Sequence, residues 1–185
     1  MRRSLSSSVS KMLVAIAFVA GAAAQSAGAQ AKPMQSFGVG YTDIGPTLGL
    51  GNLGGASASF GGRFEHAIKP LPDMGNGMLG IQAGFEWYSW SAPFYSWTYI
   101  PIGVTANYHF RLDDPKFDPF IGLGLGYQII TCDFKGTGVS GCSNSAIYFI
   151  GRAGARYFFS PKMAAYADVG AGASTLSVGL MFKLP

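Results

Sequence analysis

The sequence predicts an all-β protein, an eight-stranded antiparallel up-and-down barrel that spans a membrane. Apolar residues alternate with small or polar ones along segments of about ten residues, the length of a membrane strand. Turn residues separate these segments, and none of the segments shows a sustained helical period. Only 12% of the residues are charged, about half the share typical of a soluble domain. Together these observations favour strands that have one lipid-facing side.

Residues 1–31 are predicted to be a cleaved signal peptide, and the barrel domain is expected at 32–185. The segment begins with basic residues, and its apolar run at 12–24 is too short to cross a bilayer. Small residues at alternate positions then offer cleavage after Ala29 or Ala31. The 13 basic residues include three in this segment, which leaves 10 against 9 acidic ones. Such a balance gives no support for nucleic-acid binding.

Four segments in the first half of the mature chain alternate with a period of two, as the two faces of a strand require. The apolar faces hold Phe37, Val39 and Tyr41, continuing past Pro46 to Leu48 and Leu50 after a bulge; Phe60, Gly62 and Phe64; Leu79, Ile81, Ala83, Phe85 and Trp87; and Ile100, Ile102, Val104, Ala106 and Tyr108. The opposite faces hold Gly38, Gly40 and Thr42; Ser57, Ser59, Arg63 and Glu65; Gln82, Gly84 and Glu86; and Gly103, Thr105, Asn107 and His109.

Four further segments complete the predicted barrel. Their apolar faces hold Ile121, Leu123, Leu125 and Tyr127; Phe149, Ala153, Ala155 and Tyr157; Met163, Ala165, Ala167 and Val169; and the even positions of 176–184. The opposite faces hold Gly122, Gly124, Gly126 and Gln128; Arg152, Gly154 and Arg156; Tyr166, Asp168 and Gly170; and the Ser, Gly, Met and Lys of 177–183. The last segment alternates most clearly.

An even number of such strands fits a closed barrel, in which every backbone group is paired within the lipid. The periplasmic connections are expected at Lys69–Gly77, Arg111–Lys116 and Ser160–Pro161. The external connections are expected near Asp43–Gly55 and at Ser89–Trp97, Asp133–Asn144 and Gly172–Ala173.

The charged residues decide which face points inward. The charged residues within the predicted strands all lie on the same face as glycine and serine. They are Arg63, Glu65, Glu86, Arg152, Arg156, Asp168 and Lys183. A basic residue that faces lipid at mid-depth costs about 2–4 kcal/mol. A soluble barrel of the lipocalin type has the opposite polarity and would here expose rows of apolar side chains to water. The charges are therefore expected in the lumen of a membrane barrel.

Aromatic residues gather at both ends of the predicted strands. One group comprises Trp87, Trp90, Phe94, Tyr95, Trp97 and Tyr99, and the other comprises Phe64, Tyr108, Phe110, Phe117, Tyr157, Phe159 and Phe182. Amphipathic rings prefer the two interfaces of a membrane, so two aromatic belts are expected.

Three segments carry a resemblance to a known family: Lys116–Tyr127, Gly154–Lys162 and Ser174–Lys183. They resemble the small bacterial outer-membrane protein β-barrel domain family, similar in plan to OmpX and the membrane domain of OmpA. The resemblance covers nearly the whole mature chain. It implies a place in the outer membrane of a Gram-negative-type bacterium, among lipopolysaccharide. It also implies insertion by the barrel-assembly machinery, which reads an aromatic C-terminal strand; here Phe182 precedes three further residues.

The lumen charges are expected to form a salt-bridge plug. An eight-stranded barrel has an interior that side chains just fill, and buried charges have to be paired. Arg152 falls opposite Asp168 if the turn at Phe159–Pro161 has three residues, and one pair along in a neighbouring register. Such a network is expected to fix the register and to block a water channel.

The two cysteines, Cys132 and Cys142, are expected to form a disulfide across the third external loop. Two cysteines and two distant histidines, His66 and His109, lack the spacing of a metal site. No metal or other cofactor is expected. The pattern Gly49-x-Gly51-x-x-Gly54 matches a dinucleotide fingerprint only formally, because no helix follows it.

Three functions are compatible with this plan. The first is a non-enzymatic role, structural or in interaction at the cell surface, with a plugged lumen. The second is a porin-like conduit for small or apolar solutes of the OmpW type, with Tyr99 and Tyr148 at its entrance. The third is a lipid A-modifying enzyme, which is disfavoured because both histidines lie near the periplasmic rim, far from lipid A, and no His-x-Ser pair exists.

Overall fold

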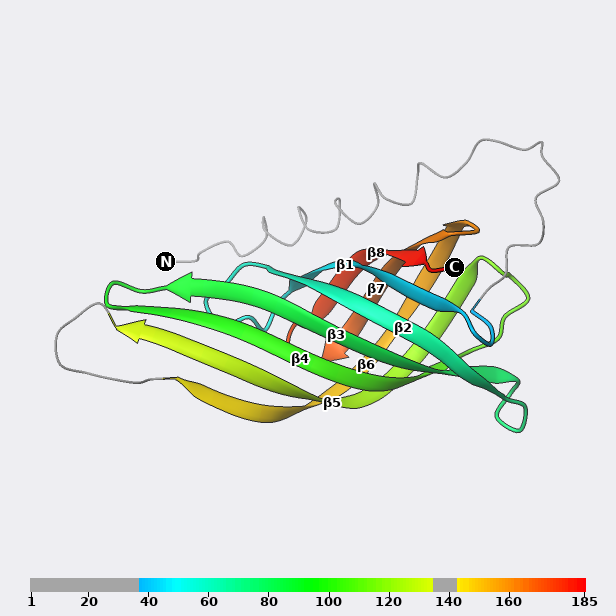
Figure 1. Ribbon diagram of the computed structural model, residues 1–185, viewed down its shortest axis with the longest axis horizontal. Coiled ribbons are helices and arrows are strands. Elements are labelled where there is room, and N and C mark those ends of the chain that lie inside the picture. Colours follow the sequence, from blue (N-terminus) through cyan, green and yellow to red (C-terminus); the bar gives the residue numbers. More distant parts are fainter. Residues whose placement is uncertain (1–36, 135–142) are drawn as a thin grey trace, which may run out of the picture. The chain divides into compact units, whose positions relative to one another are not determined.

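The computed structural model describes residues 37–134 and 143–185, which form a closed barrel of eight antiparallel strands (Figure 1). Each strand pairs with the next in the chain, and β8 pairs with β1. The predicted up-and-down barrel is confirmed. Within the described residues no helix is long and apolar enough to cross a membrane. The predicted signal peptide lies outside the described residues.

The strands differ in length. Their bounds are β1 Thr42–Leu50, β2 Ser59–Leu71, β3 Gly77–Ser91, β4 Tyr95–His109, β5 Phe117–Phe134, β6 Asn144–Ser160, β7 Met163–Ala171 and β8 Leu176–Lys183. We call the end where β1 begins and β8 ends the terminal end, and the opposite end the loop end. Because β3 to β6 have 15 to 18 residues and β1, β7 and β8 only 8 or 9, the wall is higher on the side of β3 to β6 (Figure 1).

The alternation of the sequence becomes an alternation of burial. In β5, Leu123 and Leu125 are 64% and 63% exposed on the outer surface, while Gly122 just before them and Gly126 just after them are buried and face inward. In β8, Leu180 is exposed and Ser177 is fully buried. The predicted direction of the faces is therefore confirmed, with apolar side chains outside and polar ones in the lumen.

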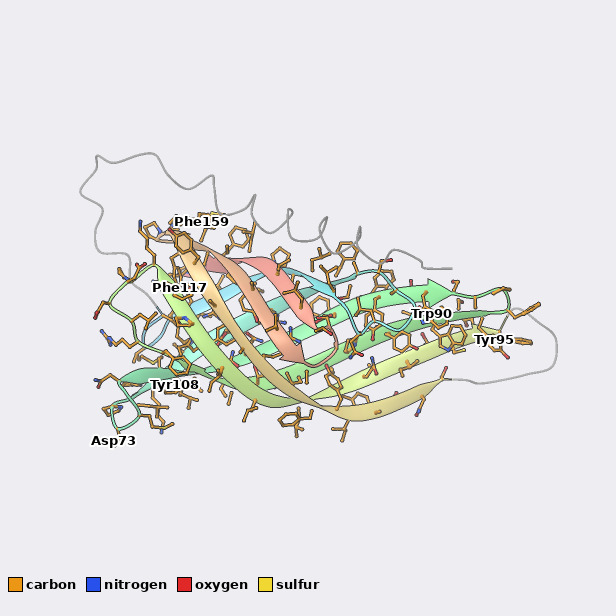
Figure 2. The ribbon with its side chains drawn as sticks, turned by 180° about the vertical axis from the view of Figure 1, so that it is seen from behind. Asp73, Trp90, Tyr95, Tyr108, Phe117 and Phe159 are labelled. Carbon is orange, nitrogen blue, oxygen red and sulfur yellow. The ribbon has the colours of Figure 1, made fainter. Side chains whose placement is uncertain are left out.

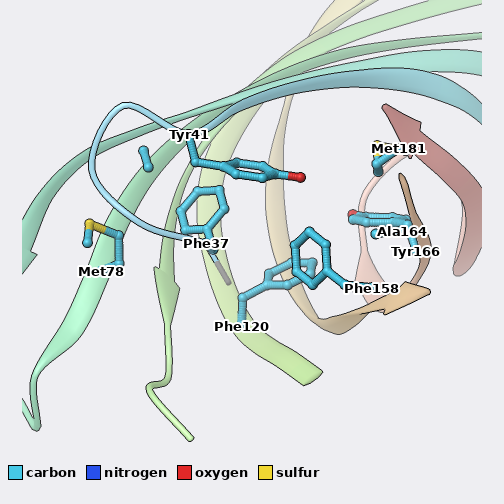
Figure 3. Close-up of a cluster of buried hydrophobic side chains, with 9 residues drawn as sticks. Phe37, Tyr41, Met78, Phe120, Phe158, Ala164, Tyr166 and Met181 are labelled. Carbon is cyan, nitrogen blue, oxygen red and sulfur yellow. The ribbon is translucent and has the colours of Figure 1, made fainter. Parts of the chain in front are cut away.

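The beginning of the barrel differs from the prediction. Residues 37–41 are not a strand, and both Phe37 and Tyr41 are buried. Gly40 has a φ of 77°, a left-handed conformation that suits glycine, and Tyr41 N donates to Gly38 O in the same turn. This turn folds the two rings into the terminal end of the lumen, against Phe158 and neighbouring side chains (Figure 3).

The first external connection was also predicted wrongly. Asp43, expected in that connection, is fully buried in the lumen near the start of β1. The connection runs over residues 51–58 instead, and Leu53 within it is 2% exposed. Other connections lie inside or close to their predicted ranges, at 72–76, 92–94, 110–116, 161–162 and 172–175.

Pro46 lies at the middle of the seam where β1 meets β8. The predicted bulge is absent, because the pairing of β1 with β2 runs through Pro46 without interruption. Thr42 and Leu50 accept hydrogen bonds from the β8 side, so even residues of β1 face β8. Pro46 therefore has no N–H where the ladder to β8 needs one. A Cβ on the adjacent Gly45 would lie 1.8 Å from Leu180 O, so the strands approach closely here.

Aromatic residues lie at both ends of the barrel, as expected. Figure 2 shows Tyr108, Phe117 and Phe159 at the terminal end and Trp90 and Tyr95 at the loop end. Not all of these rings face lipid. We call the longer strands β3 to β6 the high wall. Inward positions of its strands β3 and β4 carry two stacked ring pairs: Tyr88 with Tyr99, 4.8 Å apart between centroids, and Trp90 with Trp97, 4.3 Å apart.

Candidate functional site in the barrel lumen

Charged side chains and their polar partners form two groups along the lumen. The first, which we call the terminal-end cluster, consists of Asp43, Glu65, His109, Asp118 and Arg156. The second, the loop-end cluster, consists of Arg63, Arg152, Tyr166, Asp168 and Ser177. Inward positions of seven strands, all except β3, supply these residues, so both clusters depend on closure of the barrel.

Arg156 is the centre of the terminal-end cluster. Its side chain is 1% exposed and contacts three carboxylates. Nε lies 3.3 Å from Asp43 Oδ2, Nη1 lies 3.3 Å from Asp118 Oδ2, and Nη2 donates to Glu65 Oε2. The sheet explains this geometry, since Arg156 pairs directly with Asp118 across β5 and β6, and Asp43 with Glu65 across β1 and β2.

His109 joins two of the same carboxylates. Its Nε2 lies 2.8 Å from Glu65 Oε1, and its Nδ1 lies 3.0 Å from Asp118 Oδ1. Asn107 adds a hydrogen bond of 2.9 Å to Glu65 Oε1. When both ring nitrogens of a histidine face carboxylate oxygens, the protonated ring can donate to both. The cluster then holds three carboxylates against a guanidinium and an imidazolium.

Aromatic rings close the terminal end of the lumen, below these charges. The Phe37 ring stacks on His109 at 3.8 Å with an interplanar angle of 17°, and the Arg156 guanidinium lies 4.9 Å from the Phe37 centroid. Tyr41 meets Phe158 edge to face at 5.8 Å (Figure 3). Cations over ring faces are attracted by the ring quadrupole, so Phe37 contributes to charge stabilisation as well as to packing.

Asp168 is the centre of the loop-end cluster. Its side chain is 0% exposed, and it accepts hydrogen bonds from Arg63 Nη1 at 2.7 Å, from Arg152 Nη2 and from the Tyr166 hydroxyl. Ser177 Oγ lies 3.1 Å from Arg63 Nη2 and 3.2 Å from Arg152 Nη2. Two guanidiniums thus share a single carboxylate.

Two registers of β6 against β7 were predicted as possible, one with Arg152 directly opposite Asp168 and one shifted by a pair. The structure has the shifted register. Arg152 pairs with Gly170, and Asp168 pairs with Gly154. An irregularity between Phe158 and Ser160 shifts the register beside the turn. The long side chain of Arg152 nevertheless reaches Asp168 diagonally.

Two predicted members of the charge network have other partners. Glu86 accepts hydrogen bonds from Ser59 at 2.5 Å and from Ser174 at 2.9 Å, and none of the ion pairs in the described part of the chain includes it. The ammonium of Lys183 lies 5.3 Å from the centroid of Tyr41, again outside those ion pairs. Arg63, Glu65, Arg152, Arg156 and Asp168 form ion pairs.

Asp43, Asp118 and His109 belong to the network in the structure but were not among its predicted members. Asp118 has the same parity as Gly122 and Gly124, so extending that alternation toward the N-terminus would have placed it inward. His109 was predicted to face inward near the periplasmic rim, but no ion pair was predicted for it. No comparable pattern indicated Asp43, because residues 37–42 alternate between apolar and small residues as a lipid-facing strand does.

The other residues considered as candidates are His66, the glycine segment Gly49–Gly54 and the residues that could hold a metal. His66 is exposed, and its Nδ1 lies 2.7 Å from Thr42 Oγ1. The segment Gly49–Gly54 ends in a loop, as expected, with φ values of 75° at Gly51 and 62° at Gly54. Among residues 37–134 and 143–185, no three His, Cys, Asp or Glu residues are placed to hold a metal.

Cys132 lies on β5, but Cys142 lies outside the described residues, so the disulfide stays a prediction.

Residues 12–179 match the outer membrane protein beta-barrel domain family. The chain belongs to this family. The family assignment made from the sequence is confirmed, and with it a place in the outer membrane. A search of curated proteins gives no match.

Solved structures of outer-membrane barrels share the fold at low sequence identity. OprG from Pseudomonas aeruginosa has a TM-score of 0.58 at 13% identity, covering 82% of this chain and 99% of that one. Neisserial surface protein A has a TM-score of 0.52 at 17% identity, covering 78% and 97%. The N-terminal barrel domain of Pseudomonas aeruginosa OprF has a TM-score of 0.51 at 15% identity, covering 80% and 99%. At these identities the likeness concerns the fold alone.

Proposed function

We propose that this protein is a non-conducting, non-enzymatic outer-membrane barrel with a structural or surface-interaction role. Arg156 is the observation that supports the closed lumen most strongly. Its guanidinium is buried among three carboxylates contributed by β1, β2 and β5. An ion that passed this level would have to separate those pairs in a region of low dielectric, where their attraction is strong.

The two clusters act at successive depths. Side chains nearly fill the interior of an eight-stranded barrel, so there is little space beside a paired guanidinium. Below the charges, Phe37 and Tyr41 are 7% and 4% exposed, and they add an apolar barrier at the terminal end. A hydrated ion therefore meets an ionic barrier and then an apolar one.

Conductance of single barrels in a planar bilayer tests the closed lumen. We expect no steady open level for the wild-type barrel. Substituting Arg156→Ala removes the central guanidinium and should introduce brief openings, whereas Arg111→Ala in an exposed turn should change nothing. A large, steady conductance in the wild type would refute the proposal.

The route to the membrane is part of the same proposal. Cleavage of residues 1–31 would precede delivery to the barrel-assembly machinery, and lipopolysaccharide would surround the finished barrel at the outer leaflet. An N-terminal residue of the mature protein at Gln30 or Lys32 would support this cleavage. Uncleaved protein recovered from the outer membrane would argue against it.

A conduit for small apolar solutes is the second candidate, and the rings on the high wall favour it. Tyr88, Trp90, Trp97 and Tyr99 present an aromatic inner surface above the loop-end cluster. Such a surface suits a solute that leaves the lumen without crossing the charges. Uptake of a tritiated apolar solute into liposomes that contain the barrel, compared with protein-free liposomes, distinguishes the two candidates.

A further inference from the structure

The ring of His109 is buried between two carboxylates at the terminal end of the lumen. His109 is the last residue of β4 and is 2% exposed. Its Nε2 lies 2.8 Å from Glu65 Oε1, and its Nδ1 lies 3.0 Å from each oxygen of Asp118. A neutral imidazole carries a proton on only one of its nitrogens, so a lone pair would then face one of the carboxylates. The arrangement therefore requires the protonated ring.

The other strands packed around His109 contribute few groups that titrate or carry charge. They are Asp43 of β1, Arg156 of β6, Tyr41 just before β1 and Lys183 of β8, whose ammonium lies over the Tyr41 ring. The neighbouring residues of β3, Met78 and Gly80, carry no charge. With His109 protonated, the three carboxylates of the terminal-end cluster face two cations; without that proton they face one. Uncompensated buried charge is costly, so loss of the proton destabilises the cluster.

The position of Phe37 depends on the charge of this ring. Phe37 stacks on His109 with 3.8 Å between the ring centroids, and the Arg156 guanidinium lies 4.9 Å from the Phe37 centroid (Figure 3 shows Phe37 beside Tyr41). A cation on the face of an aromatic ring is attracted to it, and a neutral imidazole has no such attraction. Gly40 N donates to Ala67 O at 3.2 Å in the same turn. The exchange of this amide therefore reports whether the turn stays in place.

Water can reach His109 from the terminal end. A cavity of about 30 Å³ is lined by Phe37, His109 and Asp118, and by Arg111 and Asp114 of the exposed connection at 110–116. One water needs about 10–15 Å³ of such space. Protons can thus pass between His109 and the solvent at this end of the barrel.

We propose that His109 is a proton-dependent latch for the turn at residues 37–41. The protonated ring donates to Glu65 and Asp118 and holds Phe37 on its face. When the ring loses its proton, a lone pair faces a carboxylate, the attraction to Phe37 disappears, and Phe37 leaves the lumen. The latch is therefore closed at lower pH and opens as the pH rises.

NMR of the barrel purified in detergent tests the latch. The chain has two histidines, so a His66→Gln variant leaves His109 as the only one. At about pH 6 we expect the Hε1 resonance of His109 to be shifted upfield by the stacked Phe37 ring. As His109 titrates toward about pH 9, that shift should vanish, and the protection of the Gly40 amide, corrected for its intrinsic rate, should fall about tenfold, the scale of a hydrogen bond to a charged group.

Two results would overturn the latch. One is a Gly40 protection that stays constant while His109 titrates, and the other is a His109 that does not titrate in this range. Phe37→Leu should lack the upfield shift of Hε1 at either pH, which shows that the stacked ring causes it.

His109→Gln separates the latch from other titrating groups. Glutamine keeps a donor at this position but does not titrate, so the protection of Gly40 should not depend on pH. The tyrosines and lysines ordinarily titrate near pH 10, above the range measured. An equal loss of protection in His109→Gln would assign the effect to another group and contradict the latch. If this variant does not fold, the titration in the His66→Gln background still decides.

Conductance at both pH values separates the latch from the closed lumen. The loop-end cluster contains no histidine, so the lumen can stay closed while Phe37 is released. A closed channel with constant Gly40 protection would remove only the latch. An open channel at about pH 6 with the expected exchange would remove only the closed lumen.

Discussion

The removal of Arg156 from the terminal-end cluster is the most informative perturbation. In the Arg156→Met variant, Asp43, Glu65 and Asp118 would remain buried with exposed fractions of 0%, 1% and 3%. Only His109 would then be left to balance them. Removing one partner of a buried ion pair typically costs about 3–5 kcal/mol, because the other charge stays behind without compensation. We expect the free energy of unfolding to fall by about that amount.

Urea titration of the barrel in lipid vesicles, followed by tryptophan fluorescence, measures this change. Arg111→Met is the matched control, because Arg111 lies in an exposed turn and should shift the free energy by less than about 0.5 kcal/mol. A second substitution, Asp118→Asn, made in the Arg156→Met background should recover part of the loss, since one uncompensated carboxylate disappears. A loss below about 1 kcal/mol in Arg156→Met would refute the reasoning, because the cluster would then not depend on its guanidinium.

Further predictions concern the seam, the terminal end and the cysteine pair. Gly45→Ala would bring a Cβ to 1.8 Å from Leu180 O, so we expect poor folding in a vesicle-insertion assay, whereas Gly151→Ala should fold normally. Phe37→Ala should cost about 3 kcal/mol in urea titrations, because the buried ring stacks on the lumen cluster; Val39→Ala, at a position 63% exposed, should cost almost nothing. Reduction of the predicted disulfide should add two hydrogens to the intact mass and lower stability by about 3 kcal/mol. An unchanged mass would disprove the disulfide.

The outward and inward faces of most strands could be predicted because a period of two leaves little freedom. Once Leu123 faces lipid, Gly122 and Gly124 have to face the lumen, and the charged residues of the neighbouring strands follow the same rule. The energetic cost of charge in lipid then determines which face is which. The lumen positions of Arg63, Glu65, Arg152, Arg156 and Asp168 could be predicted on these two grounds, and the structure confirms them.

The start of the barrel could not be predicted in the same way. Phe37, Val39 and Tyr41 alternate with glycine and threonine just as a lipid-facing strand does. An apolar ring is equally favourable in lipid and in the apolar terminal end of a lumen, so hydropathy alone cannot distinguish them. The left-handed turn at Gly40 decides the outcome. The contacts of Arg156 with three strands were hidden for another reason, since they depend on a register that side-chain pattern alone leaves undetermined.

Photolabelling of the native barrel by a carbene probe confined to the lipid tails tests the central claim most directly. Mass spectrometry of the labelled peptides should find adducts on Leu123, Leu125 and Leu180 and none on Arg152 or Arg156. Labelling of the two arginines, with the three leucines spared, would show that the charged face meets the lipid and would contradict the account.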